Sequence, residues 1–535
     1  MKNEDRVTFS GTQLKSIFNP SDIRDQNYRK DLNFPGNFPY TRGIEPKTYR
    51  EKPWVIHTYM GFGSAEQTNQ RVKYLLNLTK NARDVGISIA LDLPTQVGID
   101  PDNPLAIGEV GKIGVSLPSL RDFGILTEGV PLNEVGYINT VGSSIAPTFI
   151  AWCVCAAKLR GINPADMRVN VQNDVLKEYT ARGTYIMPPE HGLKHSCDAI
   201  EYCSKKYPHW IPIAVSGYHL REAGAMTAAN ELGLAVSNAI AYIDALRERG
   251  LSIDKIAPSM RIFMGAGIDF LEEAAKFRAT RRLWARLIRE RYGSRNPQSL
   301  GLRIQCFTHG MNLTAQQPLN NIARVTIQAL GAILGGVQYL HTSSYDEAHS
   351  IPTEESLRVA IRTQQIILHE TSVPSVADPL GGSYYIEWLT NEIEEGAWKI
   401  VDHVDSLGGA VRAMEKGYYH RLIAEEGYRH YQKILNKEKI IVGMNEYKID
   451  EEPAFKIFRP DPEVERRQVK RVKRIRAERD KTKIQESLGR LRRSAERGKN
   501  VIPAICDVVK ADGTIGEIYQ VFRDMYGEYR APNVY

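Results

Sequence analysis

Short apolar runs alternate with longer amphipathic segments through the central part of the chain, from about residue 86 to about residue 382. The longer segments, of which residues 221–250 are typical, carry apolar residues at the 3.6-residue period of a helix. Strands that alternate with helices are typical of a parallel sheet covered by helices. We therefore predict an α/β fold, a (β/α)8 TIM barrel, with a doubly wound open sheet as the alternative. The predicted strands are ISIAL (87–91), YINT (137–140), RVNVQ (168–172), IPIAVS (211–216), MRIFM (260–264), LRIQCF (302–307), VQYLH (337–341) and SVAD (375–378).

The two flanks of this region have different patterns. Residues 1–55 are rich in Pro, Gly and aromatic side chains without a sustained period, which predicts an extended N-terminal arm around a barrel domain of residues 56–400. Residues 401–535 predict a helical C-terminal extension. Within it, residues 463–499 hold 15 Lys and Arg against 6 Asp and Glu, with apolar residues at helical spacing. This basic helix is predicted to pack on its own domain, with docking to an acidic partner subunit as the alternative.

Composition narrows the classes of protein that fit. With 535 residues and 42% hydrophobic residues, the chain can bury a large core. It has no uncharged apolar run of about 18 residues and no secretory signal at its start, so we expect a cytoplasmic protein without a membrane partner. The six cysteines are scattered, which favours reduced core thiols. Nucleic acid is disfavoured as a partner because aromatic residues are not interleaved with the basic charges.

Polar and small residues gather where the predicted strands end. His219 follows IPIAVS within SGYHLREAG, and Gln172 follows RVNV, so both are site candidates in a barrel whose chemistry lies at the carboxyl ends of its strands. Small residues at these ends would leave room along the barrel axis for a long ligand; glycines at turns and caps explain about half of them equally well. The small residues are Gly142, Ser143, Ser144, Ser216, Gly217, Gly265, Ala266, Gly267, Gly335, Gly336, Ser343 and Ser344.

Ten motifs in one order carry a family resemblance. They are YMGFGSAEQTN, LDLPTQVGIDPDNP, GEVGKIGV, VQNDVLKEYTARGTYIMPP, SGYHLREAG, AKFRATRRLWARL, LTAQQPLNNIARVTIQAL, SYDEAHSIPTEES, RTQQIILHET and DPLGGSYYIEWLT. From about residue 39 to residue 442 the chain resembles the large, acyl-CoA-binding subunit of the methylmalonyl-CoA mutase family. The resemblance implies a coenzyme A ester threaded through a (β/α)8 barrel, and adenosylcobalamin held between the barrel and a separate cobalamin-binding fold.

The resemblance also implies a partner. The family's cobalamin-binding fold carries DxHxxG, whose histidine ligates cobalt, and this motif does not occur in the sequence. We therefore expect no metal ligand in this chain. We expect a small cobalamin-binding subunit that carries DxHxxG, in a heterodimer or heterotetramer, and the resemblance leaves room for a G-protein chaperone. The basic helix is then a candidate for part of the docking surface.

Three residues are implied to be catalytic by their match to family motifs. His219 matches the histidine that donates a hydrogen bond to the thioester carbonyl. Tyr59, in HTYMGF, matches the tyrosine that rests against the substrate and helps to drive the adenosyl group from cobalt. Arg182, in TARGTY, matches the arginine that pairs with the free carboxylate of methylmalonyl-CoA. Together, Tyr59 and Arg182 favour a substrate that bears a carboxylate.

Further positions match ligand-contacting residues of the family, and several depart from its pattern. In place of PRLSFF the chain has residues 258–263, PSMRIF, and in place of RFHTQTAG it has residues 303–310, RIQCFTHG, which introduces Phe307. These changes leave open a larger or differently substituted acyl group. The implied substrate-binding residues are Gln172, Asn170, Lys52, Gln305, Tyr218 and Arg261, and the implied cofactor-binding residues are Glu347, Ser343, Leu91 and Gly142.

The leading hypothesis is an isomerase, an adenosylcobalamin-dependent mutase that interconverts methylmalonyl-CoA and succinyl-CoA by a radical carbon-skeleton rearrangement. The alternative substrates are ethylmalonyl-, isobutyryl- and 2-hydroxyisobutyryl-CoA. A remoter alternative is a non-catalytic component that keeps the barrel. A conventional hydrolase or lyase has no support, because the sequence offers no paired carboxylates, metal-ligand cluster or nucleophile elbow.

Overall fold

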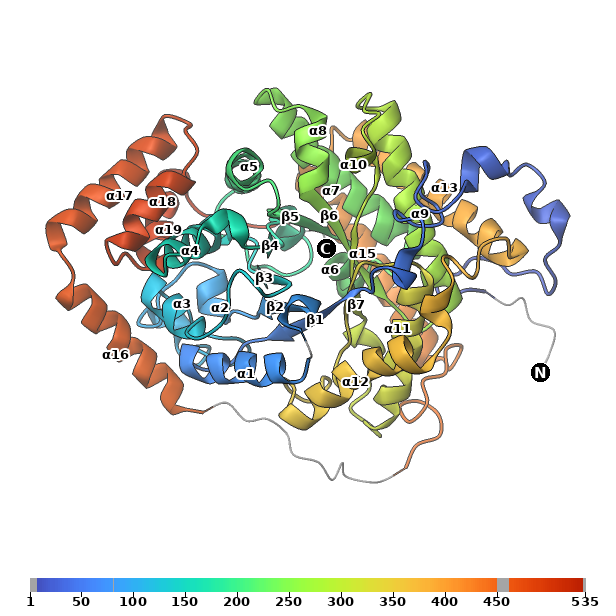
Figure 1. Cartoon of the computed structure of the whole chain (residues 1–535), viewed down its shortest axis with the longest axis horizontal. Coiled ribbons are helices and arrows are strands. Elements are labelled where there is room, and N and C mark those ends of the chain that lie inside the picture. The colour runs from blue at the N-terminus through green and yellow to red at the C-terminus, as the bar shows by residue number, and fades with distance from the viewer. Residues whose placement is uncertain (1–6, 80, 450–460, 533–535) are drawn as a thin grey trace.

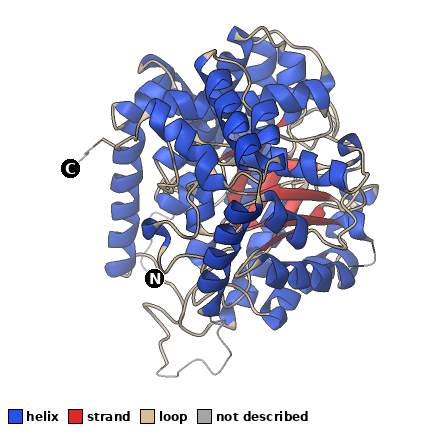
Figure 2. Ribbon diagram, turned by 90° about the vertical axis from the view of Figure 1, so that its left-hand side faces the viewer, coloured by secondary structure: helices blue, strands red, loops and turns tan. Residues whose placement is uncertain are grey.

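Eight parallel strands form a barrel at the centre of the computed structural model, which describes residues 7–79, 81–449 and 461–532. Helices enclose these strands on the outside (Figure 1, Figure 2). The α/β TIM-barrel fold expected from the sequence is therefore confirmed. The strands are β1 (Val55–Met60), β2 (Val85–Ile89), β3 (Tyr137–Thr140), β4 (Val169–Val171), β5 (Ile213–Ser216), β6 (Met260–Ala266), β7 (Ile304–Thr308) and β8 (Tyr339–His341).

The barrel closes through consecutive parallel pairings. β1 pairs with both β2 and β8, so the first and last strands are neighbours. The seam between β4 and β5 is held by a parallel bridge between Asn170 and Ile211, beside which the Val171 N–H donates to the Ile211 carbonyl at 2.8 Å. Because the strands are parallel, their carboxyl ends share one rim of the barrel and their amino ends share the other.

A helix follows each strand and packs its apolar face on the barrel. These outer helices are α1 (Ala65–Asn77), α3 (Leu120–Leu126), α4 (Ala146–Leu159), α5 (Pro189–Lys206), α7 (Ala228–Glu248), α9 (Phe270–Glu290), α11 (Asn320–Leu334) and α12 (Glu354–Glu370). Shorter helices lie in the loops: α2 (Leu93–Gln96), α6 (Tyr218–Ala223), α8 (Ile253–Ile256) and α10 (Pro297–Leu300). The largest buried apolar cluster lies between β5–β8 and α7, α9, α11 and α13 (Tyr384–Ser406).

The predicted strands were wrong at the two ends of the series. The run SVAD is not a strand: its first residue ends a 3-10 turn at Val373–Ser375, Val376 is 59% exposed, and Asp378 forms ion pairs with Arg42 and Arg278. The true first strand, β1, was missed. Its sequence, VIHTYM, mixes polar and apolar residues without clean alternation, because several polar side chains of this strand are buried inside the barrel.

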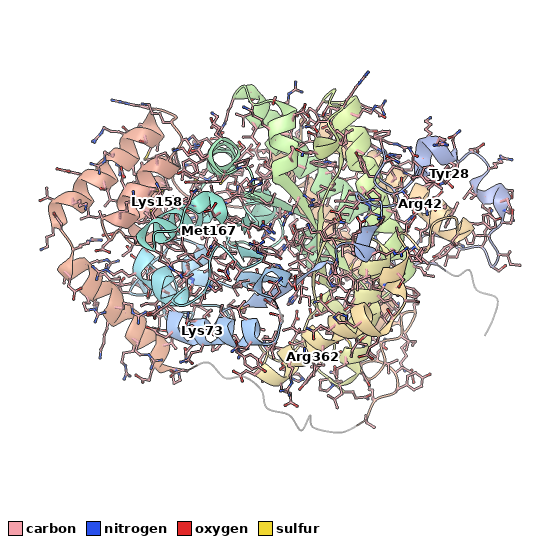
Figure 3. All side chains as sticks on the ribbon, viewed as in Figure 1. Tyr28, Arg42, Lys73, Lys158, Met167 and Arg362 are labelled. Atoms are coloured by element: carbon pink, nitrogen blue, oxygen red, sulfur yellow. The ribbon has the colours of Figure 1, made fainter. Side chains whose placement is uncertain are left out.

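The N-terminal segment lies against α9 and α13. It contains only short 3-10 and π turns, at Pro20–Ile23, Tyr28–Leu32 and Thr48–Arg50, among residues 7–54. The Arg281 guanidinium of α9, which is fully buried, donates to the backbone carbonyls of Tyr40 and Thr41 at 3.0 Å each. Arg42 pairs with Asp378 at 2.8 Å, and Figure 3 shows Arg42 beside α9. Residues 1–6 of the predicted arm lie outside the described residues.

The C-terminal extension is helical, but its basic part is two helices. α16 (Glu463–Glu478) and α17 (Lys481–Glu496) are separated at Asp480, whose side chain accepts from the backbone N–H groups of Thr482 and Lys483 and so caps α17. The predicted single basic helix is therefore wrong. The predicted domain boundary at residue 400 falls inside α13, and residues 450–460 and 533–535 of the predicted extension lie outside the described residues.

The basic helices pack on the β2–α4 side of the barrel (Figure 1). Arg471 of α16 pairs with the buried Asp122 at 2.8 Å, and Arg476 pairs with Asp102 at 2.7 Å. α18 (Ile502–Lys510) packs against α4. α19 (Ile515–Tyr526) adds Tyr519 and Phe522 to a second buried apolar cluster, which α4 and α18 share. Part of the positive charge is thus neutralised by carboxylates of the barrel domain. The remaining described helices are α14 (Ala410–Glu415) and α15 (Tyr418–Leu435).

The burial of the cysteines and the hydropathy of the helices are those of a globular protein core. All six cysteines are buried and none forms a disulfide. None of the helices in the described ranges combines the length and the apolar character that crossing a membrane requires.

Candidate active site

A cavity of about 460 Å³ opens at the carboxyl rim of the barrel. It lies over the ends of β1, β5, β6, β7 and β8, where a barrel enzyme is expected to hold its reacting groups. Six of the site residues predicted from the sequence, Tyr218 among them, meet here. Its lining includes Tyr59, Val141, Arg182, Tyr218, His219, Phe263, Phe307, His341, Ser343, Ser344 and Glu347.

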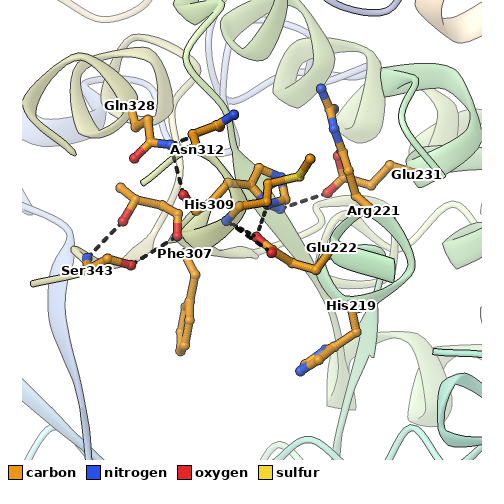
Figure 4. A network of polar contacts seen from close by, with 12 residues as sticks. His219, Arg221, Glu222, Glu231, Phe307, His309, Asn312, Gln328 and Ser343 are labelled. Atoms are coloured by element: carbon orange, nitrogen blue, oxygen red, sulfur yellow. Dashed lines mark hydrogen bonds and ion pairs between the residues drawn. The ribbon is translucent and has the colours of Figure 1, made fainter. Parts of the chain in front are cut away.

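His219 is held as a neutral hydrogen-bond donor. Its Nδ1 lies 2.7 Å from Ser216 Oγ, and its backbone N–H donates to the same oxygen at 3.3 Å. Burial, reinforced by the charges of Lys177 and Arg182, keeps the pKa of His219 well below its ordinary value. When the serine hydroxyl donates to Nδ1, the ring proton is on Nε2. In Figure 4 the imidazole points away from the polar network around His309.

Arg182 reaches the same cavity from the loop after β4. Its Nη2 donates to Gln96 Oε1 at 2.7 Å and its Nη1 to the Val141 carbonyl at 3.4 Å. Glu178 Oε1, fully buried, lies 3.7 Å from Nη1. These contacts hold the guanidinium at the cavity wall and use two of its five N–H groups, so an anionic ligand group could be bound by the others.

Tyr59, at the end of β1, forms part of an aromatic wall. Its ring lies 6.2 Å from that of Phe307 and 6.3 Å from that of His341, both in edge arrangements. Burial raises the pKa of Tyr59, and burial lowers that of His341 to about 4, so both groups are neutral near pH 7. This side of the cavity is therefore uncharged near pH 7.

Glu347 and its neighbours form the polar edge of the cavity. Burial raises the pKa of Glu347 to about 7. A Cβ at Gly310 would lie 2.8 Å from Glu347 Oε1, so glycine at this position makes room for the carboxyl group. Ser343 is fixed by Thr308, whose Oγ1 accepts from the Ser343 N–H at 2.8 Å. Ser344 Oγ is buried and has no hydrogen-bond partner among the described residues.

Three predicted residues lie behind this cavity rather than on its surface. Gln172, which is 2% exposed, accepts a hydrogen bond from Ser143 Oγ at 3.4 Å. A Cβ at Gly142 would lie 3.0 Å from Leu91 Cδ1, so these two residues pack against each other in the barrel wall. A ligand role for Leu91, Gly142 and Gln172 stays a prediction.

A second, larger cavity of about 970 Å³ opens at the amino rim of the barrel. Three predicted residues, Lys52, Asn170 and Arg261, line it. Figure 3 shows Arg362 on α12, which also belongs to its lining. The cavity is rimmed by basic side chains and suits a ligand with several phosphates. These basic residues are Lys52, Arg83, Arg168, Arg261, Arg303, Arg362, His209 and His369.

Arg261 lies on the inside of β6, two positions after the place of the arginine in the family pattern PRLSFF. It donates from Nη2 to the Tyr339 hydroxyl at 2.7 Å, and its guanidinium lies 3.9 Å from the centre of that ring. When the Asn170 side-chain nitrogen faces the Val169 carbonyl, the Asn170 side-chain oxygen accepts a hydrogen bond from Arg261 Nη1 at 2.6 Å. The sequence shift that replaced PRLSFF thus still supplies an arginine to the amino-end cavity.

Aromatic rings fill the barrel between the two cavities. On β7, Ile304 and Cys306 face the outer core, so Gln305 and Phe307 face inward. The Phe307 ring lies 4.6 Å from that of Phe263 and 4.9 Å from that of His57. The predicted open axis is therefore wrong at this level.

Several small residues have a different role from the one expected. A Cβ at Gly217 would lie 2.8 Å from Glu231 Cγ, and a Cβ at Gly335 would lie 2.6 Å from the Phe277 ring. At Gly265 the added atom would lie 1.9 Å from His309 Nε2. These glycines admit neighbouring side chains and do not open the axis.

Sequence reasoning missed His309, Glu222 and His341. His341 ends the predicted strand VQYLH, so the strand-end rule that selected His219 could have found it. His309 and Glu222 lie 87 residues apart and meet through their side chains, Nδ1 to Oε1 at 2.6 Å. No spacing pattern signals that pair.

Comparisons with known proteins identify the family. The methylmalonyl-CoA mutase family model matches residues 7–528. A methylmalonyl-CoA mutase of Rhizobium meliloti is 38% identical over 98% of this chain and 73% of its own length. The 2-hydroxyisobutanoyl-CoA mutase large subunit of Aquincola tertiaricarbonis is 37% identical over 100% of this chain and 94% of its own. The human mitochondrial methylmalonyl-CoA mutase is 37% identical over 98% of this chain and 69% of its own.

These matches extend across the barrel, both cavities and the C-terminal helices. They agree with the resemblance carried by the ten motifs. The chain belongs to the methylmalonyl-CoA mutase family of acyl-CoA isomerases.

Proposed function

We propose that this chain is the acyl-CoA-binding large subunit of an adenosylcobalamin-dependent mutase, with methylmalonyl-CoA and succinyl-CoA as its first-choice substrate pair. The observation that carries the proposal is the meeting of a neutral histidine donor, His219, and a guanidinium, Arg182, in one buried cavity of about 460 Å³. This pair suits a thioester carbonyl and a carboxylate on the same small acyl group.

The amino-end cavity is suited to coenzyme A. Its basic rim can bind the phosphates, while Lys52 and Arg303 lie at the exposed edge where a highly charged nucleotide would remain in contact with water. Asn170 and Gln305 face the axis between the cavities and would meet the pantetheine arm. For the arm to reach His219, the Phe307 ring must change its rotamer.

His219 acts as the donor to the thioester carbonyl in this proposal. An Nε2–H aimed at that oxygen polarises the carbonyl group as it migrates to the neighbouring carbon. Because burial keeps the imidazole neutral, the ring donates a hydrogen bond without giving up its proton. Ser216 keeps the donor tautomer by supplying a hydrogen to Nδ1.

Arg182 and Tyr59 select and enclose the acyl group. The guanidinium binds the free carboxylate in a bidentate fashion, held in place by Gln96 and the Val141 carbonyl. Tyr59, with Phe307 and Tyr218, supplies an apolar wall that excludes water from the reacting carbons.

The polar edge of the cavity fits the ribose of an adenosyl group. Ser344 Oγ has no partner among the described residues, and Glu347 is a buried carboxyl group beside it in the cavity lining, so both can bind ribose hydroxyls. Adenosylcobalamin, when bound, supplies the radical chemistry that starts the rearrangement. We assign the cobalt ligand to a small partner subunit, because a relative that matches 100% of this chain and 94% of its own length is named a large subunit.

A second candidate substrate is a branched acyl-CoA without a free carboxylate, of the isobutyryl or 2-hydroxyisobutyryl type. Phe263 and Phe307 favour it, because they give the cavity an apolar floor next to His219. Ethylmalonyl-CoA, which keeps the carboxylate and adds a methylene group, is the intermediate case.

Turnover of an acyl-CoA panel tests the proposal. The chain is mixed with a DxHxxG-bearing small subunit and adenosylcobalamin, and isomerised products are followed by mass spectrometry. We expect dicarboxylic esters to be turned over faster than isobutyryl-CoA. Turnover of uncharged esters alone would contradict the role of Arg182, and no turnover of any ester would contradict the mutase assignment for this pair of subunits.

A further inference from the structure

The helix that carries His219 cannot fix its own orientation. α6 has six residues, begins after Gly217 without a side-chain cap, and ends at Gly224, whose φ is +134°. A helix this short has little intrinsic stability. Contacts from neighbouring elements therefore determine how α6 is rotated about its axis, and this rotation determines where His219 points.

His309 contacts one face of α6 twice. It is the first residue after β7, and its Nδ1 lies 2.6 Å from Glu222 Oε1. Its ring stacks on that of Tyr218, with centroids 5.3 Å apart and planes 8° apart. Tyr218 and Glu222 are four residues apart and so share a helix face. Figure 4 shows the imidazole above Glu222, on the side of the network away from His219.

The imidazole is itself held in a fixed place. The His309 backbone N–H donates to the Ala266 carbonyl at 2.9 Å, and its carbonyl accepts from Gln328 Nε2 at 3.1 Å. Gly265 receives the ring, because any Cβ there would overlap Nε2. The φ of Gly265 is not positive, so glycine is needed here for space and not for backbone conformation.

A separate contact, made by Arg221, also anchors α6. Arg221, which is 1% exposed, pairs with Glu231 at 2.9 Å inside the barrel wall. Glu222 also accepts the Met311 backbone N–H at 3.2 Å. Arg221 thus ties α6 to the barrel wall, whereas His309 and Glu222 connect α6 to the loop after β7.

We propose that His309 is a positioning residue for this enzyme: through Tyr218 and Glu222 it sets the rotation of α6, and so aims the His219 Nε2–H at the thioester oxygen. His309 lies outside all ten motifs that carry the family resemblance. The inference rests on the donor role proposed for His219.

A pair of ligands that differ only in the carbonyl group tests the proposal without any cofactor. Isothermal calorimetry on the full chain measures the affinities of succinyl-CoA and of S-(3-carboxypropyl)-CoA, its thioether counterpart. The ratio of the two affinities reports the hydrogen bond to the carbonyl. We expect His309→Ala to lower this ratio about tenfold, the usual effect of losing one hydrogen bond, with the thioether affinity unchanged.

Further variants separate positioning from general damage. His309→Phe keeps the stacking on Tyr218 without the bond to Glu222, and Glu222→Gln keeps the volume without the charge; each should lower the ratio by less than His309→Ala does. His191→Ala is the matched control, because His191 also stacks on a tyrosine, Tyr526, but on α5 far from α6. It should leave the ratio unchanged.

A double variant shows whether His309 acts through His219. When His219 is already alanine, His309→Ala should have no further effect on the ratio. The positioning role is overturned if His309→Ala weakens both ligands equally, or if neither His309→Ala nor Glu222→Gln lowers the ratio although His219→Ala does. If His219→Ala itself leaves the ratio unchanged, the donor role in the proposed function fails instead. Should His309→Ala not fold, Glu222→Gln and His309→Phe carry the same test.

Discussion

The two ends of the barrel present opposite environments to one extended ligand. The amino-end cavity is about twice as large, 970 Å³ against 460 Å³, and its rim carries basic groups that reach water. The carboxyl-end cavity holds its polar groups among buried rings, and burial lowers the pKa values of His219 and His341. The first is built to attract charge and the second to direct a few hydrogen bonds.

This difference suggests that the amino-end cavity controls affinity and the carboxyl-end cavity controls the rate of the reaction. Exposed charges act over several ångströms and are screened by salt, so each contributes little. Buried donors act only at contact, but a misplaced one has a large effect because water cannot replace it. Substitutions at the amino end should therefore change binding, and those at the carboxyl end should change turnover.

The largest effect is expected at His219. His219→Ala removes the donor to the thioester and should lower turnover about 10²–10³-fold, the range for losing one such donor. The affinity for free coenzyme A should remain within about twofold, because the substitution lies at the other end of the barrel. Initial rates and calorimetry on the same preparation measure both quantities. Unchanged turnover would contradict the donor role and remove the contrast between the ends.

Arg182 should give the next largest effect, and only with some substrates. Arg182→Gln removes a charge-assisted hydrogen bond, so kcat/KM for methylmalonyl-CoA should fall about 10–100-fold. The same variant should turn over isobutyryl-CoA, which has no free carboxylate, at the rate of the unmodified enzyme. An equal fall in kcat/KM with both esters would show that Arg182 supports the cavity wall and does not bind the carboxylate.

Arg303 at the amino rim should give a smaller effect that salt removes. Arg303→Gln should raise the KM for the acyl-CoA about 2–5-fold at low ionic strength without a change in kcat, because its side chain is half exposed. At about 1 M salt the difference should disappear, since screening then acts over about 3 Å. Arg295, exposed and outside the cavity lining, is the matched control. A change in kcat would contradict the separation of the two ends.

Glu347 should give the smallest effect, on thermal stability. Burial raises its pKa from 4.5 to about 7, so the folded state holds this proton more tightly than the unfolded state. Ionising Glu347 therefore lowers the free energy of unfolding. This loss of stability is absent below about pH 4.5, grows as the pH rises, and is complete above about pH 7. Glu347→Gln removes this loss and should raise the melting temperature by about 1–3 °C at pH 8. Melting curves at pH 8 and pH 5 measure it, and an equal shift at both would contradict the assignment.

The sequence predicted the barrel because most strands and helices have clear periods. It failed at β1 because the side chains of His57, Thr58 and Tyr59 are polar yet face the barrel interior or its wall, so the strand has no apolar alternation. It failed at SVAD because a short β-prone run has no local mark that separates a strand from a loop fixed by ion pairs.

The site residues that lie within family motifs could be predicted from the sequence. His219, Arg182, Tyr59 and Glu347 come together in one cavity, as the resemblance implied. The contact between His309 and Glu222 could not be predicted, because it depends on how two loops meet in space. The glycines were misinterpreted for the same reason: a space that looks open in the sequence is filled by a side chain from elsewhere, as at Gly265.

The position of the last helices means that one apolar helix of the barrel stays uncovered for much of translation. The apolar helix α4 (Ala146–Leu159) is covered by α18 (Ile502–Lys510), which is made more than 300 residues later. At about 5–20 residues per second, the ribosome needs about 20–70 s to reach it. During that time a nascent barrel must keep the side of α4 that carries Thr148 and Cys155, which contact Tyr519 and Cys506, away from other chains. Production of this enzyme should therefore depend on chaperones that bind nascent chains, and on the rate of translation, more than its final stability suggests.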